Sequence, residues 1–314
     1  MTNYIFILGG VISGLGKGVT SGSIGATLKE MGFKITIKKM DPYLNIDPGT
    51  MNPIEHGEVY VTHDGGETDL DLGYYERFAE IKVTKNNSIS SGKLLLDLFK
   101  RERKGEFLGK TVQVVPHFTN AIKNFIQLDA NKYDFIICEI GGSAGDIEGM
   151  AFFEAIRQLK QELNNKVLIC FLTFLVYYQA SKELKTKPTQ VAVKQLMSFG
   201  IKPDILFARS EHPISKELKK KIANMTSVYQ KNIIPALNVP SIYQVPLEYK
   251  KGGLVNIITD HFQIKEKKKP TFNKWITLNN KINNLKHNVK IGIVGKYVEL
   301  EDSYYSVIEA LKHA

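Results

Sequence analysis

One stretch near the start of the chain constrains the fold more than any other. Residues 4–21 are YIFILGGVISGLGKGVTS. Tyr4–Leu8 is a short apolar run with β-branched and aromatic residues, which predicts a buried strand. A glycine-rich turn follows, and a helical pattern then continues through Lys29. The sequence therefore predicts a strand, a tight turn and a helix in immediate succession.

The turn has the chemistry of a phosphate-binding loop. Glycine allows the backbone to adopt positive φ and to approach a ligand closely. Backbone N–H groups at the start of a helix point toward a bound anion, and the helix dipole favours negative charge there. Lys17 adds a positive charge where the β- and γ-phosphates of a nucleotide would lie. We expect a phosphate cradle here; the alternative is a flexible strand-to-helix turn.

The loop departs from the standard G-x-x-x-x-G-K-[ST] pattern at two positions. Gly16 and Lys17 match it, but Val11 stands where the first glycine belongs and Gly18 replaces the Ser or Thr. That hydroxyl group normally helps to hold Mg²⁺, so a metal ion at this site would need carboxylates from elsewhere in the chain.

Composition narrows the class of protein. The 314 residues suffice for one large or two smaller domains. No signal peptide is recognisable, and the longest apolar run, Val167–Tyr178, is shorter than the ~20 residues of a membrane span. Cys138 and Cys170 lie in strand-like runs, so we expect no disulfide framework and a cytoplasmic location. The net charge of +10 favours anionic partners, and without a basic stripe interleaved with aromatics these are small anions rather than nucleic acid.

A second strand is predicted at Lys34–Met40, where the residues alternate and are partly β-branched. A loop rich in Pro and Gly begins at Asp41-Pro42, at the strand end where open α/β sheets place ligands. Lys38 and Lys39 occupy opposite faces of this strand. One of them is a candidate to face the phosphates; the alternative is a pair of solvated edge lysines.

Two carboxylates are candidates to replace the missing hydroxyl group. The loop-rich stretch 56–78 contains an acidic cluster from which we select Asp71, with a solvated acidic loop as the alternative. Glu139 ends an apolar run in DFIICEIGGSAG, as in a Walker-B strand, which would place its oxygens where Mg²⁺ bridges phosphates. A buried, unpaired Glu is costly without a compensating cation, and a structural Glu paired with a lysine is the alternative.

The rest of the chain alternates strands with helices, which predicts an α/β fold with a mostly parallel, doubly wound sheet and flanking helices. Further strands are expected at Thr111–Val115, Lys166–Leu175 and Asp204–Ala208, and helices at 89–104, 116–128, 216–225 and up to Leu163.

Two later segments also bear on function. The lysines, hydroxyl and amide of KELKTKPTQ (residues 182–190) suit a triphosphate, with a solvated loop as the alternative. From Ile264 the chain becomes Lys/Asn-rich without a clear apolar face, as in a linker. A strand at Val289–Val294 and a helix from Ser303 would then open a further domain, since 26 residues cannot bury a core alone.

Five motifs together resemble the CTP synthase family, in the family's order: GGVISGLGKG, KKMDPYLNIDPGTMNPIEHGEVYVT, DGGETDLDLGYYERF, CEIGGSAGDIE and KTKPTQ. The resemblance implies a P-loop-type, dethiobiotin-synthetase-like synthetase (amidoligase) domain at residues 1–264. A linker at 265–288 and an N-terminal fragment of a class I glutaminase domain at 289–314 would follow. It also implies a homotetramer with UTP at subunit contacts, CTP as feedback inhibitor, GTP as activator, and neither nucleic acid nor membrane as partner.

The resemblance also implies roles for single residues. Lys17 and Lys39 would be the catalytic, phosphate-contacting lysines, and Asp71 and Glu139 the Mg²⁺ ligands. ATP would be bound by Gly14, Leu15, Gly16, Lys17, Gly18, Val19, Asp71, Leu237, Asn238 and Val239. UTP and CTP would be bound by Ser13, Asp146, Ile147, Glu148, Lys185, Thr186, Lys187, Pro188, Thr189, Gln190 and Lys221.

The family's reaction converts ATP, UTP and glutamine into CTP, ADP, phosphate and glutamate. Its glutaminase needs a nucleophilic cysteine, and neither Cys138 nor Cys170 lies in the implied glutaminase segment, so we expect this chain to use ammonia. A P-loop ATPase or switch module is the alternative, but such a protein has no use for a second triphosphate site at 185–190. The third hypothesis is a nucleic-acid binder, whose affinity for polynucleotides would depend steeply on salt concentration.

Overall fold

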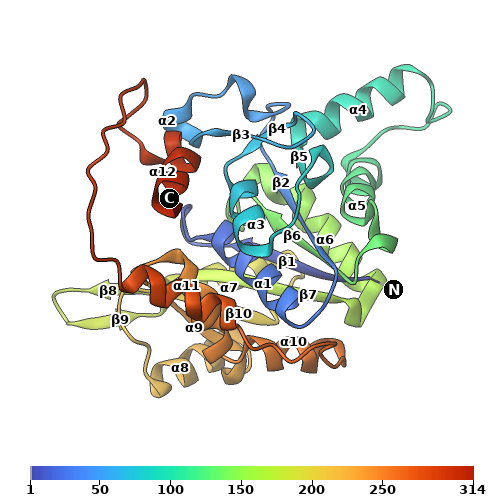
Figure 1. Cartoon of the computed structure of the whole chain (residues 1–314). Helices are drawn as coiled ribbons and strands as arrows, with labels where there is room; N and C mark the ends of the chain where they lie inside the picture. Colours follow the sequence, from blue (N-terminus) through green and yellow to red (C-terminus); the bar gives the residue numbers. More distant parts are fainter. Residues whose placement is uncertain (1) are drawn as a thin grey trace.

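A parallel β-sheet of seven strands forms the centre of the fold in the computed structural model, which describes residues 2–314 (Figure 1). The strand order is β11-β10-β7-β1-β6-β2-β5, and every neighbouring pair is parallel. The strands are β1 (Asn3–Gly9), β2 (Ile35–Asp41), β5 (Ser88–Ser90), β6 (Phe135–Ile140), β7 (Val167–Phe174), β10 (Ile205–Ser210) and β11 (Ile233–Leu237). The predicted α/β fold with a parallel sheet is confirmed.

Helices cover both faces of the sheet, as expected for a doubly wound fold. One face carries α1 (Lys17–Glu30), α3 (Asp71–Ala79), α9 (Val245–Lys251) and α10 (Leu254–Phe262). The other carries α4 (Ser91–Arg103), α5 (Thr119–Gln127), α6 (Met150–Leu163), α7 (Lys187–Ser198) and α8 (Lys216–Thr226).

The central strand shows why the sequence pattern was informative. In β1, Tyr4, Phe6 and Leu8 join the core beneath α4–α8, whereas Ile5 and Ile7 join the core beneath α1 and α3. Successive side chains of a strand point to opposite faces, so a strand buried on both faces is a continuous apolar run. The chain leaves β1 toward β2 and later crosses to β7 on the other side of β1. The carboxyl ends of β1, β6 and β2 therefore meet at a point where such sheets bind ligands.

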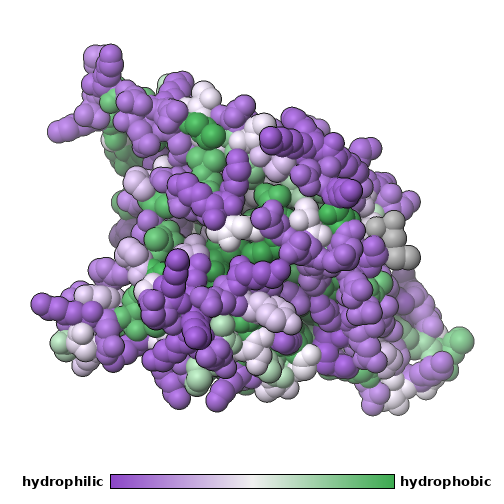
Figure 2. Space-filling model, turned by 90° about the horizontal axis from the view of Figure 1, so that it is seen from below, coloured by the Kyte–Doolittle hydropathy of each residue, from purple (hydrophilic) through white to green (hydrophobic). Residues whose placement is uncertain are grey.

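Smaller elements surround this edge of the sheet. Two antiparallel hairpins, β3 (Val59–Val61) with β4 (Glu67–Asp69) and β8 (Val176–Tyr178) with β9 (Glu183–Lys185), extend from it, and α2 (Pro53–His56) precedes β3. We did not predict these hairpins, and neither did we predict α3, α9, α10 or strand β11. Seen from below, the molecule presents a mainly hydrophilic face on which hydrophobic side chains form small patches (Figure 2).

Two predicted strands are wrong. Thr111–Val115 is irregular and runs into a π-helical turn at Val114–Phe118, and Val289–Val294 is an exposed irregular segment. Both have strand-like composition, but a strand also needs a neighbour for its backbone N–H and C=O groups. Within residues 2–314 neither segment pairs with one. The helix predicted at 116–128 correspondingly begins later, at Thr119.

The segment 265–288 is not simply a linker. It contains α11 (Asn273–Asn283), whose Trp275 is buried with Phe272 against Phe78 and Tyr243. Two aromatic residues therefore anchor a helix that lacks a continuous apolar stripe, so the sequence pattern of this segment does not reveal the helix. The last helix, α12 (Tyr305–His313), matches the one predicted from Ser303.

Two other expectations concern the whole chain. Cys138 and Cys170 are both free thiols buried in central strands, in agreement with the absence of a disulfide framework. Among the helices that the structure describes, none has the length and apolar character needed to cross a membrane.

Candidate active site

The glycine-rich loop connects the end of β1 to the start of α1. Gly16 has φ +84° directly before the first helical residue, a left-handed conformation that glycine adopts without strain. Lys17 begins α1, and its Nζ donates a hydrogen bond to the carbonyl oxygen of Gly142 at 2.7 Å. Burial lowers the pKa of the Lys17 ammonium, and Glu139 opposes that shift. The Lys17 ammonium thus lies between the end of β1 and the loop after β6.

Asp71 explains the glycine that replaces the usual hydroxyl residue at position 18. A Cβ atom added to Gly18 would lie 2.4 Å from Oδ1 of Asp71 and 2.8 Å from Cδ2 of Tyr74. The Asp71 carboxylate, at the first residue of α3, therefore fills the space that a Ser or Thr side chain would need. The loop therefore lacks a hydroxyl group at this position, and a carboxylate from another helix lies in its place.

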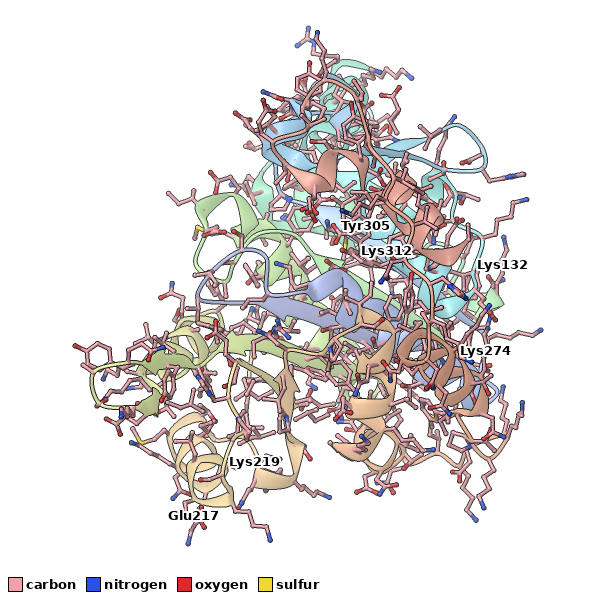
Figure 3. All side chains as sticks on the ribbon, turned by 60° about the vertical axis from the view of Figure 1, so that its left-hand side comes forward. Lys132, Glu217, Lys219, Lys274, Tyr305 and Lys312 are labelled. Atoms are coloured by element: carbon pink, nitrogen blue, oxygen red, sulfur yellow. The ribbon has the colours of Figure 1, made fainter. Side chains whose placement is uncertain are left out.

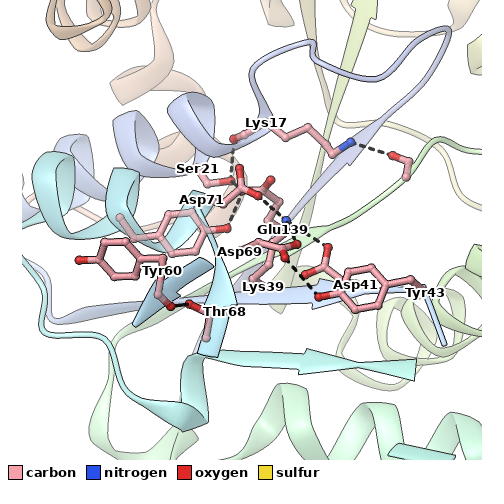
Figure 4. Close-up of polar contacts among 12 residues, drawn as sticks. Lys17, Ser21, Lys39, Asp41, Tyr43, Tyr60, Thr68, Asp69, Asp71 and Glu139 are labelled. Atoms are coloured by element: carbon pink, nitrogen blue, oxygen red, sulfur yellow. Dashed lines mark hydrogen bonds and ion pairs between the residues drawn. The ribbon is translucent and has the colours of Figure 1, made fainter. Parts of the chain in front are cut away.

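Lys39 lies at the centre of the carboxylates (Figure 4). Its side chain is only 5% exposed, and its Nζ contacts Asp41 at 3.0 Å, Asp69 at 3.5 Å and also Asp71. Burial alone would lower the pKa of Lys39, but these carboxylates raise it well above the usual value. Lys39 is therefore the lysine of the predicted pair that faces the site.

Lys38 points to the opposite face of β2. Its Nζ donates hydrogen bonds of 2.7 Å to the carbonyl oxygens of Phe125 and Leu128 at the end of α5. Like Lys39, Lys38 is buried, so the alternative of two solvated edge lysines is wrong. The two side chains make different contacts because adjacent strand residues face opposite sides of the sheet.

Glu139 is 1% exposed at the end of β6. Its Oε2 accepts hydrogen bonds from the Ser21 hydroxyl at 2.8 Å and the Tyr75 hydroxyl at 2.7 Å. Its hydrogen-bond partners are therefore hydroxyl groups rather than a lysine. Burial and, to a smaller extent, the Asp71 charge raise the pKa of Glu139 to about 7.

Several residues of this cluster were not selected from the sequence. Asp41 and Asp69 both contact Lys39, and Tyr43 donates a hydrogen bond to Asp69 at 3.2 Å. A signal for Asp41 was its place before a proline at the carboxyl end of β2, and a signal for Asp69 was its spacing of two from Asp71. Nothing comparable indicates Ser21 and Tyr75, because only the packing of α1 and α3 brings their hydroxyl groups to Glu139.

The donor set fits a magnesium ion that arrives with a nucleotide. In the part of the chain that the structure describes, no three His, Cys, Asp or Glu side chains converge as a complete metal site. Mg²⁺ usually takes only one or two protein carboxylates and completes its shell with waters and phosphates. Asp71 fills the place of the usual hydroxyl ligand, and buried Asp41 leaves its Oδ2 without a hydrogen-bond partner among the described residues. Oxygen donors of this kind suit Mg²⁺.

The residues expected to bind UTP and CTP form a second neighbourhood beside the loop. The start of α7 is tied down by hydrogen bonds from Thr189 Oγ1 to the Phe174 carbonyl oxygen at 3.0 Å and from Gln190 Nε2 to Thr186 Oγ1 at 2.9 Å. The loop after β6 lies against the same helix, since a Cβ at Gly145 would be 3.1 Å from Gln195. Most of the expected side chains here are exposed, namely Ser13, Asp146, Ile147, Glu148, Lys185 and Lys187, whereas Pro188 is half-buried.

Lys221 reaches this neighbourhood from α8, which packs beside α7. Its side chain is exposed. The pKa of Glu183 in strand β9 is lowered by hydrogen bonds from Lys185 and Ser181, with smaller contributions that include the charge of Lys221.

Leu237–Val239 lies at the same edge of the sheet but further along it, because β10 and β7 separate β11 from β1. Arg209 Nη2 donates to Asn238 Oδ1 at 2.8 Å, and a contact of 2.9 Å between the hydroxyls of Thr20 and Tyr249 ties α9 to α1. The segment therefore flanks α1 on the side away from Lys39.

Comparison with known proteins gives a consistent result. The family model described as the CTP synthase N-terminus matches residues 3–264. The chain is 49% identical to CTP synthase of Cereibacter sphaeroides strain ATCC 17025 and 50% identical to those of Paracoccus denitrificans and Pelagibacter ubique, over all 314 residues. It spans 57–58% of the length of these relatives.

Among solved structures, the signal recognition particle receptor FtsY from Elizabethkingia anophelis, in complex with GDP, is similar at a TM-score of 0.40 and 10% identity. That similarity covers 84% of this chain and 64% of that one, and it is too low to carry an inference. The family model and the curated relatives are decisive, and they show that this chain belongs to the CTP synthase family.

Proposed function

We propose that this chain performs the synthetase half of CTP formation. ATP phosphorylates O4 of UTP, and ammonia then replaces the phosphate at C4. The observation that supports this proposal best is the cluster of Lys17, Lys39, Asp71 and Glu139 where β1, β2 and β6 end. Residues 1–264 would form the synthetase domain, and 289–314 would be the start of a class I glutaminase domain.

The proposed chemistry needs no protein nucleophile. In the first step O4 forms a bond to Pγ while the bond from Pγ to the bridging oxygen of ADP breaks, and N3 of the uracil loses its proton. Lys17 and Lys39 would offset the charge on the transferred group, which is the main task in phosphoryl transfer. In the second step a C4–N bond forms, phosphate leaves with the C4–O electron pair, and nitrogen loses a proton. Mg²⁺ held by Asp71 and Glu139 would neutralise phosphate charge when bound.

The pyrimidine nucleotides would bind beside α7. Ser13, Asp146–Glu148, Lys185–Gln190 and Lys221 would form this site, and the Leu237–Val239 segment would lie beside the adenine of ATP. The exposure of Lys187 and Lys221 supports the proposal, since exposed ammonium groups can meet a triphosphate, whereas the Lys185 ammonium pairs with Glu183 in this structure. We also propose the homotetramer, inhibition by CTP and activation by GTP that the family resemblance implies.

The proposal predicts that the 314-residue chain makes CTP from UTP, ATP, Mg²⁺ and ammonium chloride. The rate should rise with pH as more free NH₃ becomes available. Chromatography of the nucleotides measures the product. ATP hydrolysis that proceeds equally well without UTP would indicate an ATPase or switch module instead.

Glutamine as the sole nitrogen donor should give neither CTP nor glutamate with this chain. A glutaminase requires a reactive thiolate. Both cysteines are buried in the sheet, and burial raises the pKa of the Cys138 thiol to about 12 and that of Cys170 well above its usual value. Glutamate release by the purified 314-residue chain would contradict this prediction.

Asp71→Asn and Glu139→Gln should each raise the Mg²⁺ concentration needed for half-maximal turnover, by about tenfold or more. Because the pKa of Glu139 is raised from 4.5 to about 7, a proton competes with Mg²⁺ below pH 7. Mg²⁺ affinity in the parent should therefore weaken as the pH falls through 7, and Glu139→Gln should lose this dependence. Asp97→Asn, on the exposed side of α4, is the control. Parent-like Mg²⁺ titrations of both variants would mean that other groups hold the metal.

Lys187→Ala and Lys221→Ala should weaken UTP and CTP together, by about tenfold each, and ATP much less. A charge-assisted hydrogen bond contributes about 1.5–3 kcal/mol, and 1.4 kcal/mol is a factor of ten. Calorimetry with the three nucleotides separately measures these affinities, and Lys220→Ala on the same helix is the control. A loss confined to ATP would contradict the assignment of this site.

A further inference from the structure

Helix α12 packs against the part of the molecule that carries the candidate ATP site. The chain leaves α11, is exposed over residues 283–299, and returns beside α2 and α3 (Figure 1). Three contacts of α12 lead toward the site. Each of them reaches either an element that carries a site residue or the segment directly beside such an element or residue.

The first contact is aromatic. The Tyr305 ring lies 5.2 Å from the Tyr74 ring, and the Arg77 guanidinium lies 5.1 Å from the Tyr305 ring and 5.2 Å from that of Tyr74 (Figure 3 shows Tyr305). Tyr74 and Arg77 follow Asp71 in α3 by about one and two turns. Tyr74 itself packs against Gly18, where an added Cβ would be 2.8 Å away. Tyr305 is thus one side chain away from both Asp71 and the phosphate loop.

Arg77 makes α3 depend on this contact. Its Nε and Nη2 are buried without a hydrogen-bond partner among the described residues, so the two aromatic faces and the negative charge of Glu309 compensate its burial. On the side of α3 it is confined, because a Cβ at Gly73 would lie 2.8 Å from Nη1. Removing the Tyr305 ring would leave the guanidinium with one aromatic face and open it to water, and α3 would lose a packing partner two turns from Asp71.

The other two contacts hold neighbouring elements. Glu58, directly before β3, accepts a hydrogen bond from the Ser306 backbone N–H at 2.9 Å, and its negative charge suits the N-terminus of α12. The hairpin that β3 begins carries Asp69. Glu309, which is 2% exposed, accepts a hydrogen bond from the Tyr243 hydroxyl at 2.8 Å and pairs with Lys312 at 2.9 Å. Tyr243 lies in the turn that follows Leu237–Val239.

We propose that α12 is a positioning element for the ATP and metal half of the site, and that Tyr305 is a positioning residue for Asp71. The proposal rests on the proposed function, in which Asp71 holds Mg²⁺. Asp71 opens α3 without a side-chain cap, so its place depends on its contact with Lys39 and on the packing of the helix further along. Apart from Ser13, the residues proposed for UTP lie in the loop after β6, in β9 and on α7 and α8, and both of these helices pack on the opposite face of the sheet. The effect of α12 is therefore specific to ATP and Mg²⁺.

The test compares Tyr305→Ala with Tyr305→Phe, which keeps the ring, and with Val307→Ala, an exposed position on the same helix. Ammonia-dependent CTP formation is measured while Mg²⁺, ATP and UTP are varied in turn. Tyr305→Ala should raise the Mg²⁺ requirement and the KM for ATP roughly tenfold, as loss of outer-sphere support usually does, and leave the KM for UTP unchanged. Tyr305→Phe and Val307→Ala should behave like the parent. An equal rise for all three ligands, parent-like behaviour of Tyr305→Ala, or a Phe variant as impaired as the Ala variant overturns the proposal.

Hydrogen exchange separates this proposal from the proposed function. Without nucleotide, the amides of residues 71–77 should exchange faster in Tyr305→Ala than in the parent, Tyr305→Phe and Val307→Ala. If the parent makes no CTP, the proposed function fails but this measurement still tests the coupling. Unchanged exchange in Tyr305→Ala overturns the proposal whatever the activity. If Tyr305→Ala does not fold, Tyr305→Leu, which keeps apolar bulk without an aromatic face, takes its place with the same expected result.

Discussion

Lys17→Ala should lower ammonia-dependent CTP formation by at least about 100-fold and leave the fold intact. A charge-assisted contact is worth about 1.5–3 kcal/mol in ordinary settings, and a contact that follows charge in the transition state is worth more. The Lys17 ammonium is held over the end of β1 by a single hydrogen bond to the Gly142 carbonyl oxygen. Its removal breaks this one hydrogen bond, and the loss should fall mainly on kcat.

Steady-state kinetics with ammonium chloride, together with a thermal melt of the same sample, tests this expectation. Lys29→Ala is the matched control, because Lys29 lies at the far end of the same helix and donates a 3.1 Å hydrogen bond to the Glu80 carbonyl oxygen. Near-parent turnover in Lys17→Ala would remove the phosphate-cradle assignment. A melting temperature far below that of Lys29→Ala would assign the effect to folding instead.

Gly18→Ser should impair the chain severely, although it makes the loop match the standard G-K-[ST] pattern. The new Cβ would lie 2.4 Å from Asp71 Oδ1 and 2.8 Å from Tyr74 Cδ2, so either α3 or the phosphate loop must move. Displacing Asp71 would disturb its contact with Lys39 and the proposed metal site together. We expect a loss of turnover of about 100-fold, in line with the cost of misplaced catalytic groups, and a higher Mg²⁺ requirement.

A matched substitution separates the effect of the steric clash at Gly18 from the general effect of replacing a glycine by serine. Gly65→Ser lies in the β3–β4 turn, where no atom is within 4 Å of an added Cβ, although the φ of +78° makes that position strained as well. Activity and Mg²⁺ titrations of the two variants are compared. A Gly18→Ser variant that works better than the parent would show that the hydroxyl group, and not Asp71, is what the metal site requires.

The sequence by itself determined the centre of the fold and much of the candidate site. A continuous apolar run, a glycine turn and a helix located β1, the loop and α1 within one or two residues. The local pattern of an apolar strand ending in one carboxylate indicated Glu139, and the missing hydroxyl at position 18 directed attention to Asp71. The strand, turn and helix were predicted correctly because strand burial and glycine turns are properties of short windows of sequence, whereas the roles of Glu139 and Asp71 stay predictions.

Only the tertiary structure decided which groups meet. Lys38 and Lys39 are neighbours in sequence, yet the orientation of β2 sends one to the end of α5 and the other to three carboxylates. Val289–Val294 has the composition of a strand but lacks a partner among residues 2–314, and a strand's hydrogen bonds belong to the pair. The raised pKa of Glu139 and the fit of Asp71 against Gly18 arise where separate elements pack. Contacts between residues far apart in the chain leave no local pattern, so they could not be predicted from it.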